Sequence, residues 1–158
     1  MARKLTTAFR TFCLQSSADV LTQAFIPTGL QQNENYGLLI TRVEFLLDPT
    51  VLKAWANADI SMNISLHRSH LTSLALTHTD SKSIAQWTFA VTAQTSSVDA
   101  YIPGSFVWIP PANLVIADEE MTLSMFSIAT GQKNYLSAVV YAERTVLTPG
   151  QVIQLRAL

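Results

Sequence analysis

The sequence predicts an all-β protein: a single-domain antiparallel β-sandwich, of the jelly-roll type, with about eight strands and at most one short helix. Three observations predict this class. Segments in which apolar and polar residues alternate recur at spacings of roughly 8–12 residues. Turn-forming Pro, Gly, Asn and Asp residues separate these segments. Helical periodicity is clear in only one short segment.

The size and composition of the chain point to one domain that makes many contacts. Its 158 residues suit a single domain with its own core. We expect residues 1–18 to form an N-terminal arm or first strand, and residues 19–158 to form the sandwich. Charged residues are 13% of the chain, against roughly 25% in an average soluble domain. So few charges indicate a surface covered by other copies or partners; a neutral surface rich in Ser and Thr is the alternative.

Four strands are predicted in the first half of the chain, at residues 5–14, 20–26, 36–47 and 60–66. The first of these is the possible arm. The third is the strongest, and its alternation predicts two faces. One face holds Leu39, Val43, Phe45 and Leu47, and the other holds Arg42 and Glu44.

A short helix is predicted directly after residues 36–47. Asp48 can cap this helix, and Pro49 suits its first position. Val51 and Trp55 then follow at helical spacing. The sequence offers no other convincing helix.

Further strands are predicted at residues 84–92, 98–102, 106–109 and 114–117. In the first of these, we expect Trp87, Phe89 and Val91 to point inward and Gln86 and Thr88 to point outward. Residues 69–83 are rich in Ser, Thr and His and predict a loop.

Residues 120–145 predict a long β-hairpin that turns at Gly131–Asn134. Both faces of this hairpin are largely apolar, so we expect one face to be covered by the core and the other by another subunit. The apolar tail 152–158 is predicted to be a last edge strand or a contact arm.

The candidates for metal binding are weak, and we expect no metal and no cofactor. His67, His70 and His78 lack a spacing that would bring three zinc ligands together, so we interpret them as loop histidines near the surface. The acidic segment 118–120 lacks the spacing of a calcium loop. It is predicted to be a solvated turn, with an ion site between subunits as the alternative.

No pattern in the sequence specifies an enzyme. A Gly-x-Ser-x-Gly nucleophile elbow and a phosphate-binding glycine loop are both absent. Cys13 is the only cysteine, and its pairing with a histidine through space stays open. Glu44 and Glu143 could act as paired carboxylates, but each has an arginine close by, which fits cross-strand ion pairing.

The basic residues of the N-terminal segment are Arg3, Lys4 and Arg10. An arm of this kind can contact phosphates, but these charges are few for that purpose and the net charge of the chain is −1. We therefore expect weak or no direct binding of nucleic acid.

The segment 101–111 (Tyr-Ile-Pro-Gly-Ser-Phe-Val-Trp-Ile-Pro-Pro), the predicted late hairpin and the apolar tail resemble the small single jelly-roll structural proteins of viruses and phages. The resemblance implies an eight-stranded sandwich that self-assembles into a capsid or shell of the virion. The implied partners are further copies of the chain and other virion proteins. The chain departs from the families that package a genome, because their N-terminal arms are heavily basic.

The first functional hypothesis is therefore a virion structural protein that forms a homo-oligomer through apolar contacts. The residues expected at the subunit interface are Leu38, Ile40, Phe126, Ile128, Ile153, Leu155 and Leu158.

The alternative is a non-catalytic sandwich that binds a carbohydrate or receptor, such as a fibre tip. Aromatic side chains on a concave face would carry this function, and Trp108, Trp55 and Tyr101 are the candidates.

Overall fold

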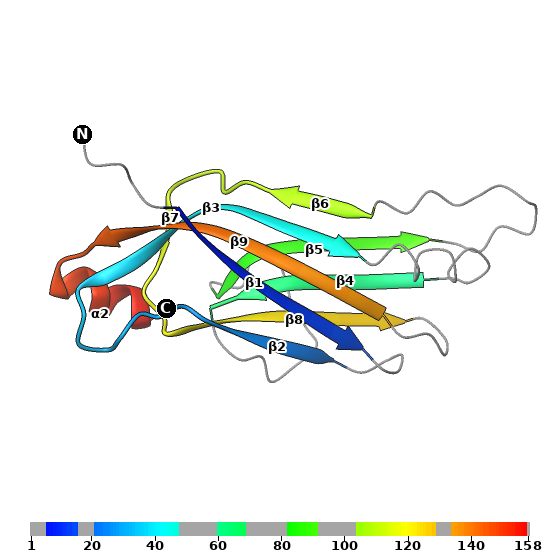
Figure 1. Ribbon diagram of the computed structural model, residues 1–158, viewed down its shortest axis with the longest axis horizontal. Coiled ribbons are helices and arrows are strands. Elements are labelled where there is room, and N and C mark those ends of the chain that lie inside the picture. The colour runs from blue at the N-terminus through cyan, green and yellow to red at the C-terminus, as the bar shows by residue number, and fades with distance from the viewer. Residues whose placement is uncertain are drawn as a thin grey trace, which may run out of the picture.

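The computed structural model describes residues 6–15, 21–47, 60–68, 82–91, 104–128 and 134–157. In this part of the chain, two antiparallel sheets pack face to face, with a helix at one end (Figure 1). The predicted all-β class and antiparallel sandwich are confirmed. What we call sheet A has the strand order β1-β9-β3-β6, with β7 also paired to β3, and what we call sheet B has the order β2-β8-β4-β5.

The strands agree closely with the predicted segments. Sheet A contains β1 (Thr6–Gln15), β3 (Tyr36–Leu47), β6 (Ser105–Trp108), β7 (Leu114–Ile116) and β9 (Asn134–Val146). Sheet B contains β2 (Thr22–Pro27), β4 (Ile60–His67), β5 (Ser83–Val91) and β8 (Glu120–Ile128). The helix predicted after residue 48 and the strand predicted at 98–102 lie outside the described residues.

The strands pair from the two ends of the chain inward. β1 pairs with β9, β2 with β8, β3 with β6 and β7, and β4 with β5. Two further ladders, β3 with β9 and β4 with β8, then join these pairs into the two sheets. The chain is thus one long folded ribbon whose successive pairs alternate between sheets A and B.

The predicted hairpin over residues 120–145 is wrong, although both of its strands exist. β8 lies in sheet B between β2 and β4, whereas β9 lies in sheet A between β1 and β3. Each strand turns one apolar face to the shared core, and β8 is flanked by strands on both sides, so the two strands are not partners of each other. The connecting residues 129–133 lie outside the described residues.

The core lies between the sheets, and buried residues alternate along the strands as the two-residue period requires. On β4 and β9 these are Met62, Ile64, Leu66, Leu136, Ala138, Val140 and Ala142. On β5, Trp87 is buried and Thr88 is exposed, as predicted. The Trp87 ring stacks on Phe106 of β6 with 5.6 Å between centroids, so an aromatic contact joins the two sheets.

A β-bulge interrupts β3 at Thr41. Ile40 is opposite Ala142, and Arg42 is opposite Tyr141, the adjacent residue of β9, so Thr41 is the extra residue between them. The Thr41 hydroxyl donates a hydrogen bond to the backbone carbonyl of Tyr141 at 3.1 Å, which fixes the bulge.

This bulge corrects the predicted faces of β3. Before it, Leu38 and Ile40 point into the core and are 3% and 1% exposed; after it, Val43 and Phe45 point into the core and are 0% exposed. Strict alternation predicts Leu38 and Ile40 on the outer surface, but the extra residue reverses the facing of every side chain beyond it. Leu39 is accordingly on the outer side, where it is half-buried.

The C-terminal segment is a helix, α2 (Pro149–Ala157), so the predicted edge strand is wrong. The Gln151 N–H donates to the Thr148 hydroxyl at 3.3 Å, and the Thr148 N–H donates to Oε1 of Gln151 at 2.9 Å. This reciprocal pair is a capping box, and Pro149 occupies the first helical position. The capping box starts a helix although the apolar character of the tail suggests a strand.

No helix in the described ranges has the length and apolarity needed to cross a membrane.

Two arginines attach α2 to the end of the sandwich. Arg156 donates from Nε to the Ala117 carbonyl at 3.0 Å and from its terminal nitrogens to the carbonyls of Gln31 and Gln32. Arg68, which is 6% exposed, donates to the Leu155 carbonyl in the last turn of α2, a carbonyl with no partner inside the helix.

Arg68 also forms an ion pair with Asp118, with 2.9 Å between Nε and Oδ2. The acidic segment 118–120 is therefore only in part the solvated turn that the sequence predicts. Glu119 and Glu120 are exposed, but the Asp118 carboxylate compensates the charge of a buried guanidinium.

Replacing Thr148 by Ala should lower the free energy of unfolding by about 1 kcal/mol, because the first N–H groups of α2 lose their acceptor. Urea denaturation followed by circular dichroism measures this change. Gln154→Ala, at an exposed position of the same helix, is the matched control and should change stability by less than about 0.5 kcal/mol. Equal effects of the two substitutions would contradict a role for the capping box.

Candidate functional site

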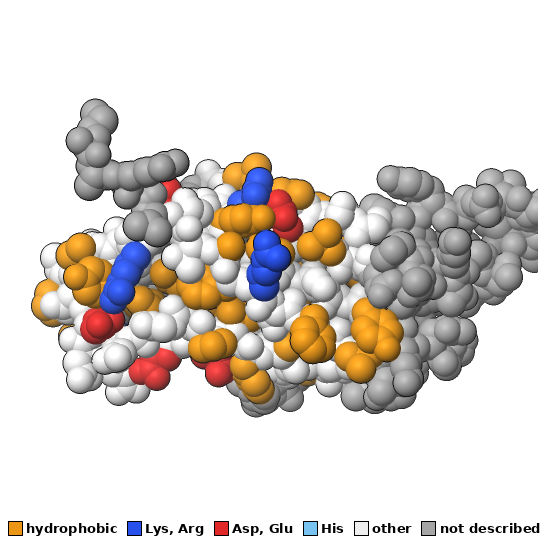
Figure 2. Space-filling view, viewed as in Figure 1, with side chains coloured by type: hydrophobic (Ala, Val, Ile, Leu, Met, Phe, Trp, Pro, Cys, Tyr) orange, Lys and Arg blue, Asp and Glu red, His pale blue; other side chains and the backbone are white. Residues whose placement is uncertain are grey.

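The side of sheet A that faces away from the core carries an unusual number of apolar side chains. We call this surface the outer A face, and it is the side seen in Figure 2. Its strand residues are Thr6, Ala8, Arg10, Phe12 and Leu14 on β1, Tyr135, Ser137, Val139, Tyr141 and Glu143 on β9, Leu39, Arg42, Glu44 and Leu46 on β3, Ser105 and Val107 on β6, and Val115 on β7.

Large apolar side chains are exposed across this face. Phe12 is 71% exposed, and Val107, Leu46, Tyr135 and Leu14 are 50%, 41%, 41% and 39% exposed. Ile109, just beyond β6, is 68% exposed. Figure 2 shows such side chains scattered over the face with a few charges among them. Apolar groups gathered on one face of a sheet indicate an interaction surface.

A compact charged group lies in the middle of the outer A face. Arg42 forms an ion pair with Glu44 at 3.1 Å and lies over the Tyr141 ring, 4.1 Å from its centroid. The Tyr141 hydroxyl donates a hydrogen bond to Glu44 at 3.3 Å. These contacts hold Arg42 and Glu44 in fixed positions. Both residues belong to β3, so their ion pair lies within one strand and is not the predicted cross-strand pair; the contact of Glu44 across the strands is the hydrogen bond from Tyr141.

Arg10, one of the residues predicted to contact nucleic acid, lies on the outer A face. It is exposed on β1 between Ala8 and Phe12. Its side chain has no ion pair or hydrogen bond within the described residues. Arg3 and Lys4, the other predicted nucleic-acid contacts, lie outside the description.

The predicted interface residues are not brought together. Leu38 and Ile40 are in the core, for the reason given above. Phe126 lies on the outer side of sheet B and is half-buried. On α2, Ile153 is 70% exposed and Leu155 is half-buried. Nothing is described for Leu158 or for the side chain of Ile128.

Sequence reasoning missed most of the outer A face. Phe12 and Leu14 share their strand face with Arg10, and this alternation is visible in the sequence. It does not reveal which face is turned to the core, because Cys13 and Phe9 on the opposite face are equally apolar. Only the pairing of β1 with β9 decides which face of β1 is turned to the core.

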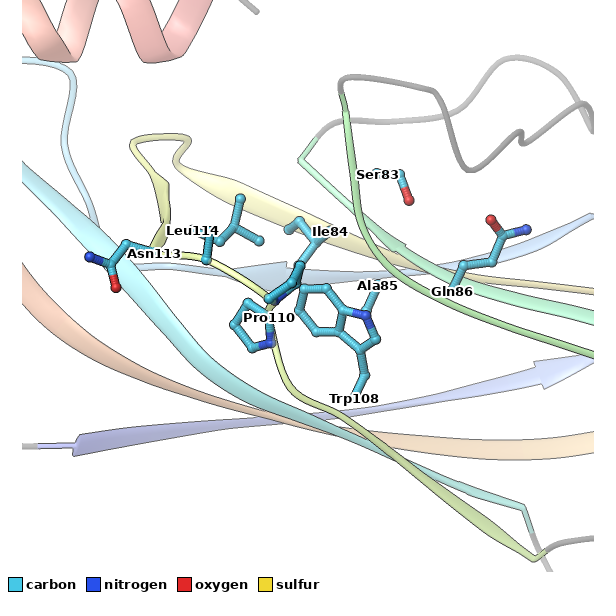
Figure 3. A pocket seen from close by; sticks show the side chains of 10 residues that line it. Ser83, Ile84, Ala85, Gln86, Trp108, Pro110, Asn113 and Leu114 are labelled. Atoms are coloured by element: carbon cyan, nitrogen blue, oxygen red, sulfur yellow. The ribbon is translucent and has the colours of Figure 1, made fainter.

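A cavity of about 460 Å³ lies at the open edge of the sandwich, between β5 and the chain around β6 and β7. Figure 3 shows Ile84, Leu114 and Pro110 around the Trp108 indole, with the amides of Gln86 and Asn113 farther out. Trp108 is thus half-buried beside a cavity and is not on an open concave face. Trp55 and Tyr101 lie outside the described residues.

A buried polar row occupies the outer side of sheet B. The His67 Nε2 atom is 2.7 Å from the Ser65 hydroxyl, which is 3.4 Å from the Ser124 hydroxyl. The interpretation of His67 as a loop histidine is wrong, because it ends β4 and is 0% exposed. A serine beside a histidine can act as a nucleophile and base, and here both side chains are buried. His70 and His78 lie outside the described residues.

Cys13 is buried on the core side of β1, 2% exposed. Burial raises the pKa of its thiol from 9.0 to about 11, because the low-dielectric core disfavours the thiolate. The side chain therefore stays neutral at physiological pH and packs as an apolar group. Within the described ranges, no group of three or more His, Cys, Asp or Glu residues could hold a metal ion.

Comparison with known proteins gives no family for this chain. Neither the scan against protein-family models nor the search of curated proteins finds a match.

Cys13 should resist thiol reagents in the folded protein. At pH 8, a pKa of about 11 leaves roughly 100-fold less thiolate than the ordinary pKa of 9.0, and burial hinders the reagent further. Labelling with a chromogenic disulfide should be at least 100-fold slower in buffer than in denaturant. Equal rates in the two conditions would show that the core does not cover this thiol.

Proposed function

We propose that this chain is a non-catalytic structural subunit that assembles with further copies of itself into a shell of the virion type. The observation that carries this proposal is the outer A face, where Phe12, Val107 and Leu46 are exposed although they lie on a rigid sheet. An ordinary antiparallel sheet with one solvated face has polar residues there.

The energetics support burial of this face. Each Å² of apolar surface removed from water contributes about 25 cal/mol, and an extended sheet offers this gain without reorganising its backbone. Association has a substantial entropic cost, so the net affinity of one contact is far smaller than the gross gain. Repetition around a symmetric particle multiplies such contacts.

The strand order supports the finer proposal that the sandwich is a jelly roll. A ribbon that pairs β1 with β9, β2 with β8, β3 with β6 and β4 with β5 gives two sheets of interleaved strands. Two Greek-key connections of this kind define the architecture, which occurs in viral capsid proteins and in lectins. The exposed apolar face favours the first of these functions.

A closed shell needs more than one type of contact, since a single two-fold contact ends at a dimer. Ile153, which is 70% exposed on α2, is the best candidate for a second contact. The arginine contacts of α2 hold this side chain in a fixed position at the end of the sandwich. Half-buried Leu155 and Phe126 are weaker candidates.

We assign Arg10 to this assembly and not to nucleic acid. It lies on the outer A face next to Phe12, and a phosphate contact there would leave the surrounding apolar groups in water. The net charge of −1 also provides no general attraction to a polyanion.

The cavity beside Trp108 favours a second candidate function, the binding of a sugar or a similar ring. An indole beside a cavity of about 460 Å³ can stack on the apolar side of a ring. A glycan screen read by tryptophan fluorescence tests this, with Trp108→Phe as the variant. A change of fluorescence that persists in the variant would place the ligand elsewhere. If no glycan changes the fluorescence of the wild type, this function is contradicted.

Phe12→Asp should reduce assembly, because a carboxylate within the buried face would be desolvated without a partner. Sedimentation velocity over a range of protein concentrations gives the concentration at which half of the chain is assembled. We expect this concentration to rise at least tenfold in the variant. Phe25→Asp is the control, since Phe25 is 48% exposed on the opposite sheet. A wild-type chain that remains monomeric at every concentration and ionic strength would contradict the proposed function.

A further inference from the structure

We propose that two copies of the chain stack by their outer A faces about a two-fold axis that runs along β9, with Arg10 of each copy opposite Glu44 of the other. This inference rests on the proposed function and adds the partner, the symmetry and the recognition residues. Its evidence is the register of the strands in sheet A.

The register arranges the outer A face in rows across the strands. In one row, Arg10 of β1 is opposite Val139 of β9, and Val139 is opposite Glu44 of β3. In the next row, Phe12 is opposite Ser137, which is opposite Leu46. β9 therefore forms a central column, with β1 on one side and β3 on the other.

A two-fold axis along β9 exchanges the two flanking columns. When two faces meet about this axis, the β1 column of one copy lies over the β3 column of the other, so Arg10 meets Glu44 and Phe12 meets Leu46. The residues of β9 meet their own counterparts. At the centre of the contact these are the neutral Ser137 and Val139, with Tyr135 and Tyr141 on either side of them, and Glu143 meets its counterpart in the last row of the β1–β9 ladder. Stacked sheets align their strands within about 30°, which this arrangement permits.

The charges fit this pairing. Arg10 is exposed and has no ion pair or hydrogen bond within the described residues, so it can take a new partner. Glu44 already accepts from Arg42 and from the Tyr141 hydroxyl, and these contacts hold it in place. A carboxylate has four acceptor positions and can bind a second guanidinium. Each dimer would gain this ion pair twice, once on each side of the axis.

The alternative two-fold axis runs across the strands. Placed over the Arg10–Val139–Glu44 row, it would bring Arg10 onto Arg10 and Glu44 onto Glu44, which is unfavourable on a face that loses its water. Shifted by half a row spacing, it would pair Glu44 with Arg42 of the other copy but leave Arg10 over Ala8. The axis along β9 is the arrangement that gives Arg10 a carboxylate and Phe12 an apolar partner.

The size of the face suits a reversible contact. Three strands side by side (β1, β9 and β3) and a ladder of about ten residues give roughly 500 Å² per copy, and β6 lies beyond the edge strand β1 of the other copy. This area lies below the roughly 800 Å² per partner of a standard specific interface. We therefore expect a moderate affinity, as is useful for a subunit that must correct errors during assembly.

The test uses charge reversal on the full chain, with dimer dissociation constants from sedimentation. Arg10→Glu should place Glu against Glu44, and Glu44→Arg should place Arg against Arg10, so each variant alone should dissociate at least tenfold more readily. An equimolar mixture of the two variants should dimerise again, because both contacts of the heterodimer then join opposite charges. The double variant R10E/E44R should also recover.

The mixture distinguishes this pairing from a loss of folding, since an unfolded variant would not be rescued by the other. Glu119→Arg, at an exposed position away from the outer A face, is the control and should not change the dissociation constant. Self-association of the wild type with no effect of Arg10→Glu, or with no recovery in the mixture, would overturn the pairing while the proposed function stands. A wild type that never associates would overturn both.

Discussion

The extra residue at Thr41 is the constraint on which the sandwich depends. β3 is one of the two long strands of sheet A, and without the bulge its two halves would face opposite ways. With it, Ile40 on one side and Val43 on the other both enter the core, and Arg42 and Glu44 turn outward together. The same bulge therefore completes the core and places the charged centre of the outer A face. A local break in the ladder thus fixes both the packing and the recognition surface.

The two outer surfaces of the sandwich have opposite characters. On sheet B, the polar side chains of Ser65, His67 and Ser124 are buried and bonded to one another. On sheet A, Phe12 and its apolar neighbours are exposed. In a folded monomer, the exposed apolar side chains of the outer A face gain nothing from contact with water. The distribution is favourable in an assembly that covers the outer A face, and this asymmetry is the physical basis of the functional proposal.

At the end of the sandwich that carries α2, two arginines hold the helix through hydrogen bonds and an ion pair, and one buried apolar residue adds to these contacts. Arg68 is buried, and the ion pair with Asp118 and the helix carbonyl of Leu155 compensate its desolvation. Arg156 adds contacts to backbone carbonyls of a loop and of the β7 end. Directional bonds of this kind define the position of a short helix more strictly than the single buried apolar residue Val152 could. A rigid end is what a second assembly contact requires.

The sequence by itself determined the fold class, the strand ranges and the alternation within them, because these follow from local periodicity and turn residues. It also contained the start of α2, in the Thr148–Gln151 capping box, although the apolar tail concealed it. The tertiary structure alone decided which strands pair and which face of each strand is inside. β8 and β9 separate into different sheets, and Thr41 shifts Leu38 and Ile40 into the core, because pairing is a contact between residues far apart in the chain. A surface such as the outer A face, assembled from β1, β3, β6 and β9, therefore has no signature in any single segment.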